Sequence, residues 1–151
     1  MQALLHNAVL WSALLAWALA QGGKVPIAFL LHRQWDWGLL VSPGGMPSSH
    51  SALVSAAAMA AGLCLGFDSP LFGVATAFAL IVIYDATGIR RQAGEHATLL
   101  NRIVEDLQGG RLPDGQALRE VLGHTQWEAF WGVLLGIASA YGIWRLLCVA
   151  A

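Results

Sequence analysis

The stretch Gly44-Gly45-Met46-Pro47-Ser48-Ser49-His50 places two hydroxyls and an imidazole beside a break in regular structure. Two glycines and a proline disfavour a helix or strand here, and the apolar run from Ser51 onward predicts a helix. A turn that leads into a helix leaves backbone N–H groups free, and such groups bind anions such as phosphate. Ser48 or Ser49 is a natural N-cap, so His50 would lie in the first turn beside a bound anion. The alternative is an ordinary capped turn between two membrane segments.

A second polar stretch contains Arg90 and, after five intervening residues, His96. Arginine binds phosphate oxygens in a bidentate manner, and imidazole can act as a nucleophile or as a proton donor to a leaving oxygen. Together with His50 and Lys24, these are the residue types that a phosphoryl-transfer site requires. The alternative is a solvated helix, and we adopt it for Arg102, Arg111 and Arg119. His6 receives no role, and His32 and His124 are interpreted as interfacial or structural.

The composition is that of an integral membrane protein. The 151 residues are 57% hydrophobic and only 11% charged, whereas soluble domains carry about 25% charged residues. The formal net charge of -1 and the lack of a basic stripe exclude a nucleic-acid-binding protein on electrostatic grounds. We therefore expect a single membrane-embedded helical domain over residues 1–151, in the plasma or inner membrane.

Four apolar runs predict a small bundle of about four transmembrane helices. They are Ala3–Ala20, Ser51–Gly66, Leu71–Tyr84 and Trp127–Val149. Gln21-Gly22-Gly23 is expected to end the first run. Lys24–Leu40 is too polar at its far end to span, so we expect a short interfacial or re-entrant helix with Trp35 and Trp37 at headgroup level.

Residues 85–124 form a polar region that we expect to contain a helix through Leu107, a loop and a short helical turn from Gln116. Thr125 and Glu128 have the spacing of a capping box for the last helix. Gly132 and Gly136 form a G-x-x-x-G packing face within it. The two cysteines, Cys64 and Cys148, lie in apolar runs, and we interpret them as unpaired small core residues.

If the four runs all cross, the candidate site residues gather at one membrane surface. That side also receives nearly all the cations, and Arg145 alone lies toward the other side. The positive-inside tendency makes the cation-rich side cytoplasmic. The small-residue faces of the helices also favour self-association into a homo-oligomer.

The pattern resembles the divergent branch of the type-2 phosphatidic acid phosphatase family, whose members are described as acid phosphatase/vanadium-dependent haloperoxidase-related. The resemblance covers essentially the whole chain. Three stretches carry it: Gly44–Ala52, Tyr84-Asp85-Ala86 through Arg90-Arg91-Gln92-Ala93-Gly94, and Leu122-Gly123-His124-Thr125.

The resemblance implies roles for individual residues. Pro47-Ser48-Ser49-His50 matches a Pro-Ser-Gly-His motif whose histidine protonates the leaving group. Arg90 and His96 match an Arg-x5-His motif that supplies a phosphate-binding arginine and a nucleophile that becomes phosphohistidine. From the residues and the resemblance together, the predicted phosphate-binding set is Lys24, Arg33, Ser48, Ser49, Arg90 and Arg91.

Two departures from the parent pattern stand out. Leu31 and His32 occupy the Arg-Pro positions of the motif that begins at Lys24, and Arg33 comes two residues late. The parent also places an aspartate four residues after the nucleophilic histidine, where this chain has Leu100. Asp85, Asn101 and His124 are the candidate supporting residues. On one straight helix Asp85 would lie about 16 Å from His96, so their contact needs a break at Gly88 or Gly94.

The resemblance and the residues together favour a membrane phosphatase that hydrolyses a lipid or isoprenoid phosphate, a phosphoric monoester or diphosphate, through phosphohistidine. No cofactor or metal is expected. The alternative is a non-catalytic membrane protein that binds an anionic lipid or a protein partner through the same basic face. A metal site built from His50, His96, His124 and Asp85 is a third hypothesis, but the spacing matches no metal motif.

Overall fold

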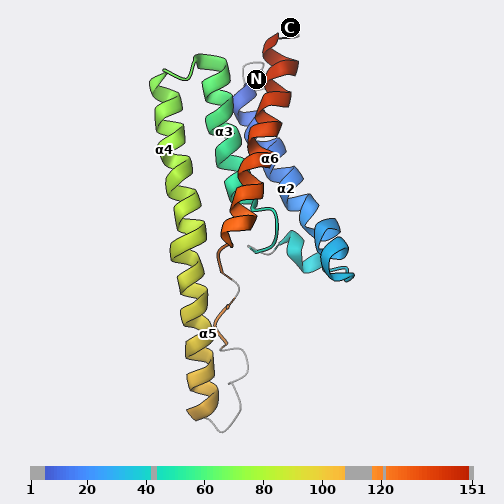
Figure 1. The fold of residues 1–151 in the computed structure, drawn as a ribbon, viewed down its shortest axis with the longest axis vertical. Coiled ribbons are helices and arrows are strands. Elements are labelled where there is room, and N and C mark those ends of the chain that lie inside the picture. Colours follow the sequence, from blue (N-terminus) through green and yellow to red (C-terminus); the bar gives the residue numbers. More distant parts are fainter. Residues whose placement is uncertain (1–5, 42–43, 108–116, 121, 150–151) are drawn as a thin grey trace.

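The computed structural model describes residues 6–41, 44–107, 117–120 and 122–149. Its helices are α2 (Ala8–His32), α3 (Ser49–Leu65), α4 (Pro70–Tyr84), α5 (Arg90–Leu107) and α6 (Gln126–Trp144), with short turns η1 (Trp37–Leu40), η2 (Asp85–Ile89) and η3 (Arg145–Val149). Helix α3 lies at the centre and packs against α2, α4 and α6 (Figure 1). The described part of the chain is thus helical, as the sequence predicts.

Helix α2 corrects the prediction for the N-terminal third of the chain. The predicted stop at Gln21-Gly22-Gly23 is wrong, because α2 runs unbroken from Ala8 to His32 with Pro26 inside it. Proline within a helix removes the hydrogen bond to the residue four before it, here Gly22, and membrane helices tolerate this loss. Most of the predicted separate helix Lys24–Leu40 therefore belongs to α2, and only Trp37–Leu40 forms a short turn of its own.

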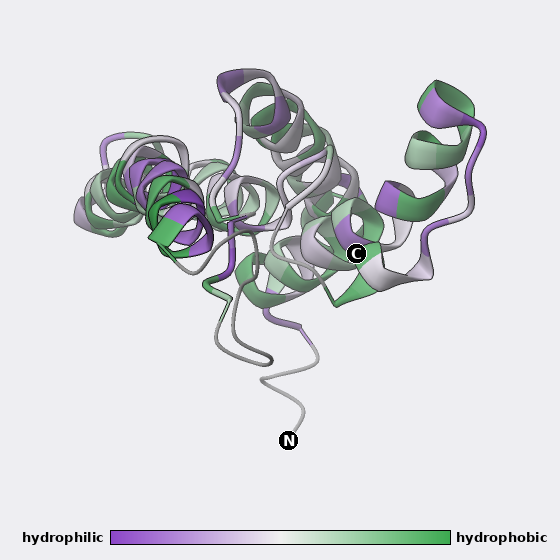
Figure 2. Cartoon of the chain, turned by 90° about the horizontal axis from the view of Figure 1, so that it is seen from below, coloured by the Kyte–Doolittle hydropathy of each residue, from purple (hydrophilic) through white to green (hydrophobic). Residues whose placement is uncertain are grey.

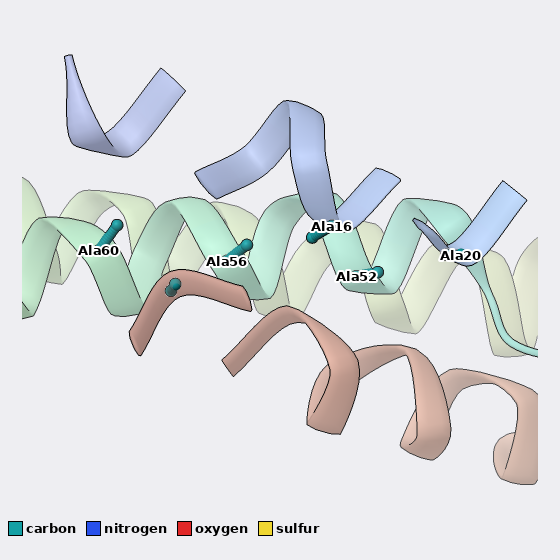
Figure 3. Packing of buried hydrophobic residues seen from close by; sticks show 6 residues of the cluster. Ala16, Ala20, Ala52, Ala56 and Ala60 are labelled. Atoms are coloured by element: carbon teal, nitrogen blue, oxygen red, sulfur yellow. The ribbon is translucent and has the colours of Figure 1, made fainter. Parts of the chain in front are cut away.

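Small residues form the centre of the bundle. A cluster of six buried alanines joins α2, α3 and α6: Ala16, Ala20, Ala52, Ala56, Ala60 and Ala140 (Figure 3). The predicted G-x-x-x-G face is confirmed, since a Cβ built on Gly132 or Gly136 would lie 2.4 Å from the carbonyl oxygen of Ser48 or Ala52. Backbones this close leave no room for larger side chains between α3 and α6.

The predicted helix Leu71–Tyr84 is confirmed, but it does not end where the polar region begins. Helices α4 and α5 are joined through the π turn η2 into one rod of 38 residues. At about 1.5 Å per residue the rod is roughly 57 Å long, nearly twice the hydrocarbon thickness of a bilayer. Its polar half, α5, projects beyond the bundle (Figure 1).

Three helical stretches are long and apolar enough to cross a membrane: Ala8–His32, Pro70–Leu107 and Gln126–Val149. The apolar helix α3 is shorter, at 17 residues, and lies between them. Figure 2 views the molecule from the α5 end, where hydrophilic ribbon is concentrated on α5 and the connecting segments. The fold is therefore an integral membrane bundle with one polar end.

The chain returns from α5 to the bundle along α5 itself. The side chain of Asn101 bonds to both the backbone N–H and the carbonyl of Leu118, at 3.0 and 2.9 Å, and to the carboxylate of Glu120. A helical turn predicted from Gln116 is wrong for residues 117–120, which are not helical. The predicted loop at Gly109–Gly115 lies outside the described residues.

The cysteines also differ from their prediction as core residues. Cys64 is half-buried near the end of α3 and Cys148 is exposed in η3. Their Sγ atoms are 3.6 Å apart.

Candidate functional site

A small cavity lies where the polar ends of the helices meet. Its volume is about 30 Å³, and it is lined by residues of α3, of the α4–α5 rod and of the segment before α6: His50, Val82, Asp85, Ala86, Arg90, Gly123 and His124. Two imidazoles, a guanidinium and a carboxylate thus line one cavity. These groups come from stretches of sequence up to 74 residues apart, from His50 to His124.

His50 is held by the start of α3. The Ser48 side chain caps the helix by accepting from the backbone N–H of Ser51 at 3.3 Å and from its hydroxyl at 3.0 Å. The backbone N–H of Ser48 donates to the carbonyl of Glu128 at 2.9 Å, which ties α3 to the first turn of α6. The ring centroids of His50 and His124 are consequently 6.4 Å apart.

The π turn η2 anchors the backbone of His124. In a regular α-helix the N–H of Arg90 would bond to the carbonyl of Ala86, four residues earlier. Here it bonds to Asp85, and the Ala86 carbonyl accepts from the backbone N–H of His124 at 2.9 Å. Gly123 permits this approach, because its φ is +81° and a Cβ there would lie 2.8 Å from the Ala86 oxygen.

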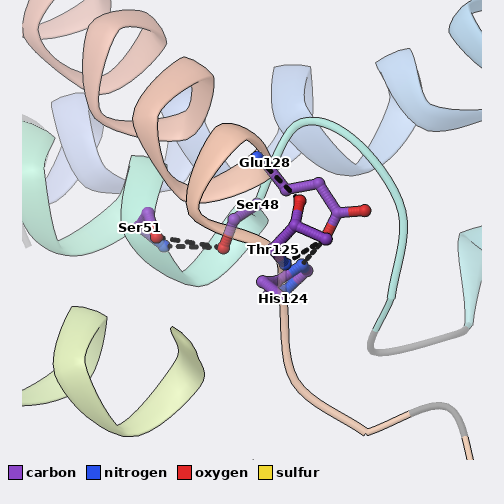
Figure 4. Close-up of polar contacts among 5 residues, drawn as sticks. All are labelled: Ser48, Ser51, His124, Thr125 and Glu128. Carbon is purple, nitrogen blue, oxygen red and sulfur yellow. Dashed lines mark hydrogen bonds and ion pairs between the residues drawn. The ribbon is translucent and has the colours of Figure 1, made fainter. Parts of the chain in front are cut away.

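The His124 ring is fixed by a carboxylate. Nδ1 lies 3.0 Å from Oε2 of Glu128, and the same oxygen accepts from the backbone N–H of Thr125 (Figure 4). A carboxylate only accepts, so Nδ1 carries the proton and Nε2 of the neutral ring carries the lone pair. Among the described residues Nε2 has no hydrogen-bond partner, and His124 is only 3% exposed.

A larger cavity of about 410 Å³ borders Thr125 and Glu128. Its polar lining includes Lys24, Asp36 and Glu128, and its apolar lining includes Ile27 and Leu31. The side chain of Lys24 is buried, at 1% exposure. Lys24 and Glu128 line this cavity together, so Lys24 lies next to the residue that holds the His124 ring.

The structure brings together four of the residues singled out from the sequence, namely His50, Asp85, Arg90 and His124. Ser48 and Ser49 directly precede His50, but both are buried and neither lines the small cavity. Lys24 lies in the wall of the neighbouring cavity.

Four other predicted site residues lie elsewhere. His96 is exposed on α5, about one and two-thirds turns beyond Arg90, and does not line the cavity of His50. The break that would bring it to Asp85 does not occur, because the rod continues through Gly88 and Gly94. Arg91 pairs with Glu95 on an exposed face, Arg33 is the exposed cap of α2, and Asn101 holds residues 117–120.

Sequence reasoning missed the pairing of His124 with Glu128. The signal was present, since Glu128 follows His124 by four residues, the same spacing that the resemblance requires after the nucleophilic histidine. Glu128 was instead assigned to the capping box with Thr125, which the structure confirms. One carboxylate oxygen performs both tasks.

Among the described residues, no group of three or more His, Cys, Asp and Glu side chains could hold a metal ion.

A model described as "Divergent PAP2 family" matches residues 5–139, nearly the whole chain. The chain belongs to the Divergent PAP2 family. This confirms the resemblance drawn from the glycine turn, the Asp85–Gly94 stretch and the segment at His124.

A curated relative supports the same placement in the Divergent PAP2 family. The chain is 45% identical over 145 residues to the "Uncharacterized membrane protein YuiD" of Bacillus subtilis (strain 168), covering 89% of this chain and 92% of the relative. No solved structure matches the chain. These findings place the chain among membrane proteins with a phosphatase-related family name, and they identify no substrate.

Proposed function

We propose that this protein is a membrane phosphatase that removes the phosphate from a lipid or isoprenoid phosphate. The observation that carries the proposal is the His124 ring, held at Nδ1 by Glu128, with Nε2 unbonded among the described residues and His50 and Arg90 lining the same cavity. A buried imidazole oriented by a carboxylate is the usual form of an activated histidine nucleophile. His124 takes the role that the sequence predicts for His96.

The reaction proceeds in two displacements. Nε2 of His124 attacks phosphorus, the bond from phosphorus to the lipid oxygen breaks, and protonated His50 donates its proton to that oxygen. Water then attacks phosphorus and His50 takes a proton from the water. The bond from phosphorus to Nε2 of His124 breaks, its electron pair returns to Nε2, and inorganic phosphate leaves. Arg90 and Lys24 hold the non-bridging oxygens during both steps.

The surroundings of the cavity suit a lipid substrate. The larger cavity beside Glu128 has apolar walls at Ile27 and Leu31, and it can receive the part of the lipid next to the phosphate. The exposed apolar surfaces of the bundle face the bilayer, so the tail stays in lipid while the phosphate reaches the polar end.

Phosphate release by the purified protein in detergent tests the proposal. The substrates are a diacylglycerol phosphate, an isoprenyl monophosphate and an isoprenyl diphosphate, each with and without orthovanadate. We expect hydrolysis of at least one substrate, inhibition by vanadate, and an acid-labile phosphorylated intermediate. His124→Ala and His50→Ala should each lower turnover by about a thousandfold, since each removes a reacting group.

The variant His96→Ala separates the two assignments of the nucleophile. On the present proposal it retains turnover near the wild-type value, because the exposed ring of His96 does not line the cavity. Loss of activity in His96→Ala with activity retained in His124→Ala would return the nucleophile to His96. Binding of lipid phosphate without any turnover would favour the non-catalytic alternative.

A further inference from the structure

The first inference rests on the proposed function and concerns Asp85. We propose that Asp85 is a positioning residue that orients the guanidinium of Arg90 toward the phosphate. The Nε of Arg90 bonds to Oδ2 of Asp85, and both residues line the small cavity with the two histidines. Because the contact uses Nε, the two Nη groups of Arg90 can still bind phosphate oxygens.

The π turn makes this contact possible. In a regular α-helix residues five apart point about 140° away from each other. In η2 the backbone bond from Arg90 to Asp85 spans five residues, so the two side chains come to the same face of the rod. The same turn leaves the Ala86 carbonyl to anchor His124, so one helical irregularity positions both the arginine and the histidine.

The neighbouring ion pair provides a matched control. Arg91 and Glu95 interact at 3.2 Å on the same rod, both are exposed, and neither lines the small cavity. Removing either acidic partner deletes one carboxylate from a partly exposed pair. The expected difference is that Asp85→Asn disturbs phosphate binding and Glu95→Gln does not.

Orthovanadate binding and substrate kinetics of the full-length protein in detergent test the role. We expect Asp85→Asn to weaken vanadate binding and raise KM by about fivefold, the effect of losing one modest ion pair, with a smaller change in kcat. Asp85→Glu should recover part of the loss. In an Arg90→Ala background, Asp85→Asn should have no further effect on vanadate binding or KM, because no guanidinium remains for Asp85 to orient.

The outcomes distinguish this inference from the proposed function. If the wild type turns over and Asp85→Asn behaves like Glu95→Gln, the positioning role is wrong and the phosphatase stands. If the wild type binds vanadate with the Asp85 and Arg90 dependence above but never turns over, the positioning role stands without catalysis. Absence of any vanadate binding overturns both.

The second inference is independent of the first and concerns the other end of the bundle. We infer that Cys64 and Cys148 are a site of disulfide formation. Their Sγ atoms are already 3.6 Å apart, and a bond requires about 2.0 Å. Both residues line one cavity of about 640 Å³ with Asn7 and Leu71, which gives reagents access to the sulfurs.

The seam of small residues between α3 and α6 brings the cysteines together. On α3 it follows steps of four residues through Ala52, Ala56 and Ala60 to Cys64, and on α6 through Gly132, Gly136 and Ala140 toward Cys148. Close backbone contacts along this seam hold the two helices near enough for their last facing residues to bond. The pairing is thus a consequence of the central packing.

The reaction needs a disulfide oxidant, either a low-molecular-weight disulfide or the active-site disulfide of a thiol oxidoreductase. One thiolate, at exposed Cys148, attacks the oxidant and releases one thiol. The Cys64 thiolate then attacks the mixed disulfide, forms the Cys64–Cys148 bond and releases the second thiol. Two cysteine thiols are oxidised and one oxidant disulfide is reduced.

Mass spectrometry of the full-length protein tests the site. Membranes are alkylated without reductant, before and after treatment with oxidised glutathione, and the protein is digested. We expect a linked peptide pair within a monomer, which disappears on reduction and in Cys64→Ser and Cys148→Ser. The oxidised wild type should also melt about 5 °C or more above the double serine variant.

Complete alkylation of both cysteines after the glutathione treatment would overturn the inference. So would a disulfide that links two copies through Cys148 and persists in Cys64→Ser.

Discussion

Glu128 binds two neighbours with one carboxylate oxygen. It accepts from the Thr125 backbone to complete the capping box, and it accepts from the His124 ring, so the start of α6 and the orientation of the imidazole depend on each other. A helix cap of this kind is worth about 1 kcal/mol. In the proposed mechanism, Glu128 also holds His124 in the tautomer whose Nε2 is unprotonated.

Glu128→Gln separates the two roles. Glutamine can still accept from Thr125, as it does in other capping boxes, so the thermal midpoint should stay near the wild-type value. The amide carries no negative charge to stabilise the imidazolium character of His124, and turnover should fall about 10- to 100-fold. Steady-state kinetics and a thermal melt of the same preparation measure both effects. Equal turnover in the two proteins would show that Glu128 only caps the helix.

The α3–α6 seam is the element-scale feature on which the site depends. It fixes the distance between the start of α3, which carries His50, and the start of α6, which follows His124. The seam can be tested with one methyl group. A Cβ added at Gly132 or Gly136 would meet the backbone of α3, whereas a Cβ added at Gly142 on the same helix would meet nothing within 4 Å.

Gly136→Ala and Gly142→Ala form a matched pair on α6. At Gly136 the new Cβ would meet the Ala52 carbonyl at 2.4 Å, whereas at Gly142 it would meet nothing within 4 Å. We expect Gly136→Ala to lower stability by about 1–3 kcal/mol, because backbone must move. Gly142→Ala should leave it unchanged or raise it by up to about 1 kcal/mol through helix propensity. Thermal melts in detergent measure both, and equal midpoints would argue against a tight seam.

The whole molecule has two distinct ends. One end carries the small cavity lined by His50, Arg90 and His124. Helix α5 projects beyond the bundle at this end (Figure 1), and the cysteine pair lies at the other end of α3. The positive-inside prediction places the first end in the cytoplasm and the second outside it.

Labelling of intact cells with a membrane-impermeant maleimide tests this orientation. In Cys64→Ser, the remaining exposed Cys148 should be labelled without lysis. In a variant without native cysteines, Glu105→Cys on the exposed side of α5 should be labelled only after lysis. The reverse pattern would place the candidate site on the outer face.

Much of the fold could be predicted because it depends on local composition. Three features can be recognised within short stretches of sequence. They are the apolar runs long enough to span, the small residues spaced for close packing, and the Thr125–Glu128 cap. The predicted end of the first helix is wrong, because glycine and proline stop helices in water more strongly than in a membrane. In a membrane, backbone groups outside a helix have no water to bond, so the helix continues through Gly22, Gly23 and Pro26.

The sequence by itself determined the class of the protein, the family and the residue types of the site, since composition and short motifs carry that information. Only the tertiary structure decided which histidine joins His50. Sequence spacing favoured His96, but the unbroken α4–α5 rod leaves that ring exposed on α5. The return of the chain along α5, the glycine at 123 and the carbonyl released at Ala86 bring His124 there instead. These are contacts between residues far apart along the chain, and no local pattern encodes them.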